Sequence, residues 1–263
     1  NNTLTSNSGN GGQGVNLSVS GTPSVGMTNI VINRNAITAR ATRAIMCNYV
    51  NDAIISNNTI SQDIQLSTAA AATIWLSTGT SAAGSFDIYG NQITYLRTWN
   101  NVAGPTASNG IIGIDNQLAT PKIVRIYNNF IAGFTTQSSS VQGVKIYGIR
   151  HANSSTSYVY NNTIHIPELT NMTNELGSYI SGIAFATAAV TEASPTGTMI
   201  LKNNIVVVNE TSMKVYAIRR VGNGGVFYSN HNNLYVNSSN TSGSIGLFDA
   251  TDLASITDWK TTS

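Results

Sequence analysis

The acidic residues are the first candidates for chemistry in this sequence of 263 residues. A polysaccharide lyase clusters carboxylates around Ca²⁺ beside a Lys or Arg that abstracts a proton, whereas a glycoside hydrolase places two carboxylates within about 10 Å of each other. No two of the acids are adjacent, no D-x-D occurs, and they fall in no common column of the sequence repeat described below. The sequence therefore predicts no catalytic residue. The eleven acids are Asp52, Asp63, Asp87, Asp115, Glu168, Glu175, Glu192, Glu210, Asp249, Asp252 and Asp258.

Metal and cofactor sites are likewise not indicated. His151, His165 and His231 lack the spacing of metal ligands, and His165 alternates with two isoleucines, so it should point outward. The glycine-rich stretches 9–14 and 222–225 do not lie between a strand and a helix, as a phosphate-binding loop would. We predict no metal and no cofactor.

Charge and cysteine content restrict the partners. The net charge is +2 and the longest basic run is the pair Arg219-Arg220, so nucleic-acid binding is not expected. The single cysteine, Cys47, excludes an intrachain disulfide and is predicted to be a small buried apolar residue. No apolar run approaches the ~18 residues that span a bilayer, so we expect no membrane insertion.

The elements that must position any site follow a repeat, in which an apolar residue is followed three positions later by Asn and five positions later by another apolar residue. In "SYVYNNTIHI" (157–166) these residues are Val159, Asn162 and Ile164. The segment 226–236 fits imperfectly because Ser229 replaces the first apolar residue, which suggests a two-residue insertion. The recurring asparagines are Asn35, Asn58, Asn91, Asn129, Asn162 and Asn203.

A second kind of strand alternates with the first and carries a small residue before an apolar one. Examples are Ala44-Ile45 in 43–50, Gly148-Ile149 in 144–151 and Gly246-Leu247 in 244–250. Successive apolar positions are 29 to 40 residues apart, so length varies in the turns rather than in the strands. A β-sandwich would not repeat the same Asn at the same strand position, and a β-propeller needs about four strands per 40–45 residues.

These patterns predict an all-β, right-handed parallel β-helix, a solenoid of about seven coils. Equivalent residues then lie above one another at about 4.8 Å, and identical amides can form an Asn ladder. Asn also tolerates the left-handed conformation of a sharp bend, where we expect the ladder residue to lie. We expect an N-terminal cap over 1–27, the β-helix over 28–250, and a C-terminal segment over 251–263 that is cut from a longer chain.

The recurring V-x-x-N-x-I coil resembles that of right-handed parallel β-helix repeat proteins, over roughly residues 28–250. The final stretch, with "NNLY" (232–235), a glycine-rich coil and "LASITDW" (253–259), is similar to secreted or cell-surface β-helix proteins of bacteria that use the type IX export route. This resemblance implies an extracellular or cell-surface location. The architecture hosts lyases, hydrolases, adhesins and structural proteins, so it does not imply one activity.

One column of the second strand type forms a candidate glycan-binding strip of Trp75, Asp115, Arg150 and Arg219. The residue after each apolar position should face solvent, where an aromatic ring can stack on a sugar and charged groups can bind hydroxyls. Alternatively, Asp115 and Arg150 form an ordinary surface ion pair, worth less than ~1 kcal/mol, and a turn covers Trp75.

The function expected from these features is that of an extracellular structural or adhesive segment without catalytic activity. A polysaccharide lyase or glycoside hydrolase on the same scaffold is the first alternative, and a glycan-binding module is the second. The expected partners are a surface polysaccharide or further copies of the chain, because the exposed ends of the sheets invite pairing.

Overall fold

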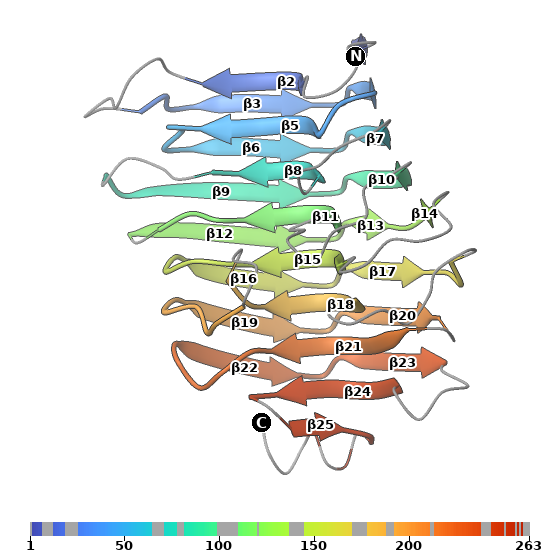
Figure 1. Cartoon of the computed structure of the whole chain (residues 1–263). Helices are drawn as coiled ribbons and strands as arrows, with labels where there is room; N and C mark the ends of the chain where they lie inside the picture. Colours follow the sequence, from blue (N-terminus) through green and yellow to red (C-terminus); the bar gives the residue numbers. More distant parts are fainter. Residues whose placement is uncertain are drawn as a thin grey trace.

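The computed structural model describes residues 2–6, 13–18, 26–64, 71–77, 82–98, 110–119, 121–136, 145–169, 178–187, 192–210, 213–237, 243–249, 251–255, 257 and 259. The strands stack into three sheets, and nearly all pairs are parallel (Figure 1). Each coil runs from sheet 1 to sheet 2 to sheet 3 and then enters the next coil. The predicted all-β parallel β-helix is therefore confirmed, with seven coils counted along sheet 1.

The bounds of the strands follow sheet by sheet. Sheet 1 contains β3 (Ile30–Asn33), β6 (Ala53–Ser56), β9 (Gly84–Tyr89), β12 (Lys122–Tyr127), β16 (Thr156–Tyr160), β19 (Thr198–Lys202) and β22 (Val226–Asn230). Sheet 2 contains β1 (Thr3–Ser6), β4 (Ala36–Ala39), β7 (Thr59–Ile64), β10 (Gln92–Thr98), β13 (Phe130–Ile131), β14 (Phe134–Thr136), β17 (Thr163–Ile166), β20 (Ile205–Asn209) and β23 (Asn233–Asn237). Sheet 3 contains β2 (Gln13–Ser18), β5 (Arg43–Asn48), β8 (Ala71–Leu76), β11 (Gly110–Asn116), β15 (Lys145–His151), β18 (Tyr179–Phe185), β21 (Lys214–Arg220), β24 (Gly243–Phe248) and β25 (Thr251–Leu253).

An Asn ladder joins the coils where sheet 1 turns into sheet 2. The backbone N–H and the side-chain amide of each ladder residue both donate to the side-chain oxygen of the next, at 2.9–3.1 Å. From Asn58 onward each amide also donates to a backbone carbonyl of the preceding coil. The ladder consists of Asn35, Asn58, Asn91, Asn129, Asn162, Asn204 and Asn232.

The prediction of Asn203 as a ladder residue is wrong by one position. Asn162 donates to the oxygen of Asn204. The inward residues that flank Asn204 are Leu201 and Val206, whereas a repeat centred on Asn203 would have placed Ile200 and Ile205 inward. Both registers of "MILKNNIVV" satisfy the repeat, so the pattern alone does not separate them. The proposed insertion before Asn232 is also absent, because β19 and β22 pair without a register shift.

The bend itself is made by the residue before each ladder Asn, and not by the ladder Asn as expected. These preceding residues adopt the left-handed conformation, with φ between 53° and 63°. Asn and Gly tolerate this conformation best, and both occur here beside one Arg and one His. The bend residues are Arg34, Asn57, Gly90, Asn128, Asn161, Asn203 and His231.

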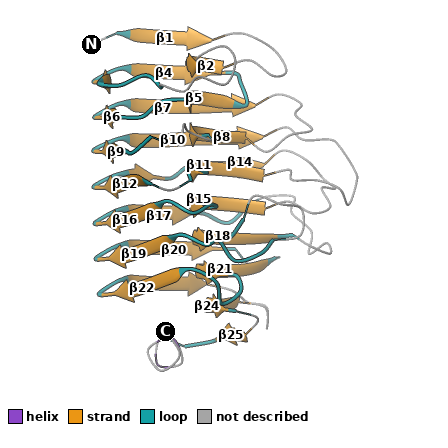
Figure 2. Ribbon diagram, turned by 90° about the vertical axis from the view of Figure 1, so that its left-hand side faces the viewer, coloured by secondary structure: helices purple, strands orange, loops and turns teal. Residues whose placement is uncertain are grey.

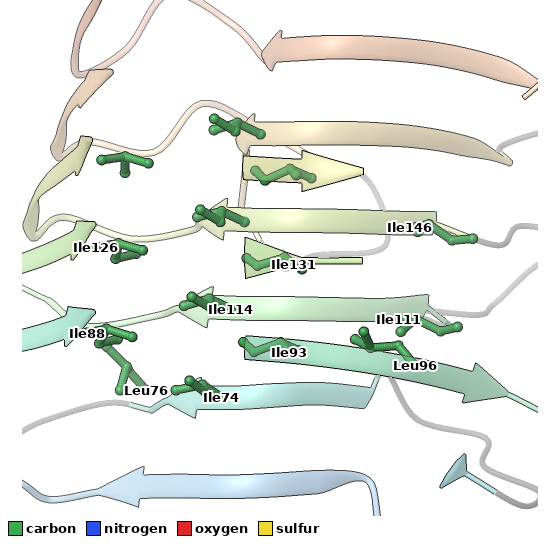
Figure 3. Close-up of a cluster of buried hydrophobic side chains, with 14 of the residues drawn as sticks. Ile74, Leu76, Ile88, Ile93, Leu96, Ile111, Ile114, Ile126, Ile131 and Ile146 are labelled. Carbon is green, nitrogen blue, oxygen red and sulfur yellow. The ribbon is translucent and has the colours of Figure 1, made fainter. Parts of the chain in front are cut away.

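The core consists of aliphatic columns that run through the coils from all three sheets, as the stacked side chains in Figure 3 show. Ile88 and Ile126 come from sheet 1, Ile93 and Ile131 from sheet 2, and Ile114 from sheet 3, and all five are buried. Burial of such side chains stabilises a fold by roughly 1.5–3 kcal/mol each. Cys47 is buried among them, as predicted, and burial raises the pKa of its thiol to about 12.

The sheets extend close to both ends of the chain (Figure 2). β1 and β2 pair in parallel with β4 and β5, so the parallel sheets begin on the N-terminal side of residue 28. At the other end β25 pairs antiparallel with β24. The ring of Trp259, 3% exposed, lies against Phe227 and Phe248 and covers the last core layer.

Candidate functional site

The four residues of the predicted strip do lie in one column on sheet 3. Asp115 is the register partner of both Trp75 and Arg150, and Ala184 joins Arg150 to Arg219. Beyond Arg219 the column continues to Leu247, because Gly246 is the register partner of Ile218.

The expectation that this column faces solvent is wrong. Asp115, Arg150 and Arg219 are only 1%, 6% and 9% exposed, and Trp75 is half-buried beneath the guanidinium of Arg43, which lies 3.9 Å from its ring centroid. The outer side of sheet 3 thus carries a second, smaller cluster of buried apolar and aromatic side chains. The strip is not an open surface for stacking on sugars.

Asp115 and Arg150 form the expected ion pair, but it is buried. The Arg150 guanidinium donates two hydrogen bonds to the carboxylate, at 2.9 and 2.8 Å, and Gln117 donates a third at 2.7 Å. Burial acts to lower the pKa of Arg150, but the attraction and hydrogen bonds of Asp115 outweigh it and raise that pKa overall. The pair joins β11 and β15 of two neighbouring coils. Removing either partner would leave an uncompensated buried charge, so the contact stabilises the pairing of these coils.

Arg219, the other cation of the strip, binds a carboxylate that the sequence did not indicate. Glu192 follows β18 in the connection to β19, and its side chain is 4% exposed. It accepts hydrogen bonds from Arg219 and Tyr147 and lies 3.8 Å from the Lys145 ammonium. The Tyr179 hydroxyl lies 2.7 Å from that of Tyr147 and also bonds to the carboxylate. We call Lys145, Tyr147, Tyr179, Glu192 and Arg219 the Glu192 cluster.

The protonation states within the Glu192 cluster suit recognition of an anion. Burial alone would raise the pKa of Glu192, but Arg219, the two tyrosine hydroxyls and Lys145 outweigh it and hold that pKa below its usual value. Burial raises the pKa of Tyr147 and of Tyr179, so both hydroxyls stay protonated and can donate. The carboxylate is therefore ionised inside a set of donors.

A face that does remain open is the outer side of sheet 1. It carries five tyrosines, which we call the tyrosine face: Tyr89, Tyr127, Tyr158, Tyr160 and Tyr228. The rings of Tyr89 and Tyr127 are stacked at 4.9 Å, and both residues are half-buried. Tyr228 is 61% exposed, and the aliphatic residues Val31, Ile54, Ile123 and Val226 on this side are 36–61% exposed.

The tyrosine face could have been predicted from the sequence by combining a repeated Tyr-x-Asn pattern with strand alternation. Tyr89, Tyr127 and Tyr160 each stand two positions before a ladder Asn, in the pattern Tyr-x-Asn. Because the residue three before the Asn points inward, the residue two before it points outward. The three tyrosines therefore form one column, and their register pairing confirms it.

Three other carboxylates also lie against cations. Asp63 receives two hydrogen bonds from Arg97, Asp87 lies 3.5 Å from Arg125, and Asp252 lies 2.8 Å from Lys214. The Asp63–Arg97 and Asp87–Arg125 pairs join neighbouring strands of sheets 2 and 1, which fits a role in holding coils in register. The Asp252–Lys214 pair reaches from β25 to β21, across the intervening strand β24.

The described ranges also show neither a metal-ligand cluster nor a membrane-spanning helix. No group of three or more potential His, Cys, Asp or Glu ligands occurs there, and no helix there is long and apolar enough to cross a membrane. Compared with known proteins, the chain matches no protein-family model, no curated protein and no solved structure.

Proposed function

We propose that this β-helix is a non-catalytic, adhesive or structural segment of an extracellular bacterial surface protein, and that it contacts a polysaccharide through the tyrosine face. The observation that carries this proposal is the column of outward tyrosines on sheet 1, beside exposed aliphatic side chains. Exposed apolar patches of this kind mark interaction sites, and tyrosine combines an apolar body with a polar tip.

The chemistry of the face favours a neutral polysaccharide. Its charged residues are two acids, Asp52 and Asp87, and two bases, Arg125 and Lys202, so no single sign dominates. Tyrosine hydroxyls can exchange hydrogen bonds with sugar hydroxyls, while the aliphatic residues meet the apolar faces of sugar rings. Successive residues within one column are separated by the strand spacing of about 4.8 Å, and this regular spacing suits a repetitive polymer that lies along the axis of the β-helix.

A shallow hollow extends this face toward the N-terminal coils. It encloses about 280 Å³ and is lined by Val31, Ile54, Asp52, Asp87 and their neighbours. Such a hollow provides an end point for a bound chain. The extracellular location rests on the resemblance to surface β-helix proteins of the type IX route.

The test is retention of the protein on polysaccharides. Wild-type protein should be retarded by neutral glucans or galactomannans in affinity electrophoresis more than by polygalacturonate. Tyr127→Ser with Tyr160→Ser should weaken binding by at least about 10-fold, or 1.4 kcal/mol. The matched control is Tyr235→Ser, an exposed tyrosine on sheet 2, which should leave binding unchanged.

Three results would contradict the proposal. The first is equal retention of wild type and the double variant. The second is turnover of any polysaccharide, with or without Ca²⁺, which would favour the lyase or hydrolase alternative. The third is a mass that rises with protein concentration in sedimentation and falls in the tyrosine variant, which would make the face a contact between copies.

A further inference from the structure

The Glu192 cluster has the composition of a ligand site rather than of a simple ion pair. Donors from three strands converge on one carboxylate: Lys145 and Tyr147 on β15, Tyr179 on β18 and Arg219 on β21. Three consecutive coils thus contribute to it. The carboxylate itself comes from outside the sheet, from the connection that follows β18.

The donors are fixed independently of the carboxylate that they bind. The Arg219 guanidinium lies over the ring of Tyr179, 4.0 Å from its centroid, and the rings of Tyr147 and Tyr179 meet edge to face at 5.9 Å. Strand pairing sets Lys145 beside Tyr179 in the neighbouring coil. The arrangement is preorganised, because rigid strands rather than the connection hold every donor.

Three buried polar atoms on β18 and β21 have no hydrogen-bond partner within the described part of the chain. They are Nε of Arg219, Nε of Arg220 and Oγ of Ser181, and Ser181 is fully buried between Tyr147 and Tyr216 in the strand register. A buried polar atom without a partner costs free energy. The Glu192 carboxylate therefore leaves Nε of Arg219 and the Ser181 hydroxyl without a hydrogen-bond partner.

We propose that Lys145, Tyr147, Tyr179 and Arg219 form a carboxylate-binding site on the outer side of sheet 3, which the protein's own Glu192 fills and which takes a free organic carboxylate when that side chain is absent. The ligand class follows from the donors. A guanidinium, an ammonium and two neutral hydroxyls match the charge and the two oxygens of a carboxylate. This site is separate from the tyrosine face and does not depend on it.

The experiment removes the resident carboxylate and supplies acetate. Thermal unfolding of Glu192→Ala is followed in sodium acetate and in sodium chloride at equal ionic strength and pH 7. Acetate should raise the midpoint of Glu192→Ala by several degrees, growing with the logarithm of its concentration once the site is saturated. Wild type should respond equally to the two salts, because its own carboxylate occupies the site. Glu192→Ala combined with Arg219→Gln should lose the acetate response.

An equal response of Glu192→Ala to acetate and chloride would overturn the proposal. If Glu192→Ala folds only with acetate, that result supports it. If it folds in neither salt, Glu192→Gln decides, because it keeps the shape of the side chain and removes its charge. Glu192→Gln should unfold at a lower temperature than wild type and ignore acetate, and a midpoint equal to that of wild type would refute recognition of a carboxylate.

Discussion

His151 shows how a polar residue is accommodated inside the β-helix. It is 1% exposed where sheet 3 turns toward sheet 1, and its ring stacks on Phe185. Its Nε2 donates to the Asn153 carbonyl at 2.7 Å, so Nδ1 is the acceptor and meets the hydroxyl of Ser157 at 2.7 Å. Burial keeps the imidazole neutral by lowering its pKa, and its contacts are those of a structural residue.

This environment predicts a pH dependence of stability. Burial lowers the pKa of His151 from 6.5 to about 4, against the opposing effects of the Asn153 hydrogen bond and Asp115. Between those pH values the unfolded chain binds a proton that the folded chain does not, so stability falls as the pH drops below 6.5. The loss from this residue is about 2 kcal/mol at pH 5.

Urea unfolding at pH 7.5 and pH 5 measures the loss, and His151→Gln provides the comparison. The variant should lose less stability than wild type over that interval, by about 2 kcal/mol, because it has no imidazole to protonate. An identical loss in both proteins would show that His151 does not titrate in this way.

Single residues also mark where sequence reasoning succeeds. The ladder positions from Asn35 to Asn162 follow from the repeat because each has one register that fits. Asn203 and Asn204 are adjacent, and both satisfy the pattern, so only the pairing with Asn162 separates them. Outward and inward positions follow from strand alternation, but burial of Arg150 depends on what covers the sheet, which alternation does not encode.

Among the elements, the strands of sheet 3 owe their small residues to a close approach of sheet 2. At Gly148 an added Cβ would lie 2.5 Å from the Ile164 side chain and 2.6 Å from the Gly182 carbonyl. Gly113 and Gly182 occupy the same place in neighbouring coils, and Ala44 and Ala217 carry the smallest side chain there. The small-then-apolar pattern of these strands thus reflects limited space.

Gly148→Ala should therefore lower the free energy of unfolding by about 2 kcal/mol, as overpacking does in a filled core. The control is Gly224→Ala, whose added Cβ would meet mainly the Ser194 side chain at 3.0–3.2 Å, so it should cost less than about 1 kcal/mol. Chemical denaturation of both variants checks this, and equal costs would contradict the crowding of the Gly148 position.

Connections between elements were the least predictable part. Glu192 lies in the connection between β18 and β19, which is longer than the equivalent connections β15–β16 and β21–β22, so no repeat could align it with Tyr147 or Arg219. The strand residues of that cluster are placed by register, and the sequence had already aligned Arg150 with Arg219. The sequence did not predict the contact of Glu192 with Tyr147 and Arg219, because that contact depends on the length of the connection that carries Glu192.

At the scale of the whole molecule, sheets 1 and 3 differ in how far their outer side chains are buried, and an aromatic ring covers the C-terminal end of the core. Sheet 3 buries its charged column, whereas on sheet 1 Tyr228 is exposed and the other outward tyrosines are half-buried. At the C-terminal end, Gly246 leaves room for the Trp259 ring, which would lie 2.4 Å from an added Cβ. Trp259 thereby closes the core over Phe227 and Phe248.

Trp259→Ala should expose these phenylalanines and lower the free energy of unfolding by about 3 kcal/mol. Because a solenoid is stabilised mainly by contacts between neighbouring coils, the loss should begin in the last coil, with faster amide exchange in β22 to β24 than in β9 to β12. The control is Trp75→Ala on the outer side of sheet 3, where exchange in β22 to β24 should stay unchanged. Uniform acceleration in Trp259→Ala would argue against a local closing role.

The ladder also has an evolutionary consequence. Its members are separated by 23 to 42 residues in sequence, yet every step is bridged by the same pair of hydrogen bonds. All donors point the same way along the row, so a duplicated or deleted coil re-forms the joint at its boundary provided that it carries one whole Asn step. Gene duplication can then lengthen this protein in whole units, while insertions between Asn steps remain free to vary and supply new surfaces.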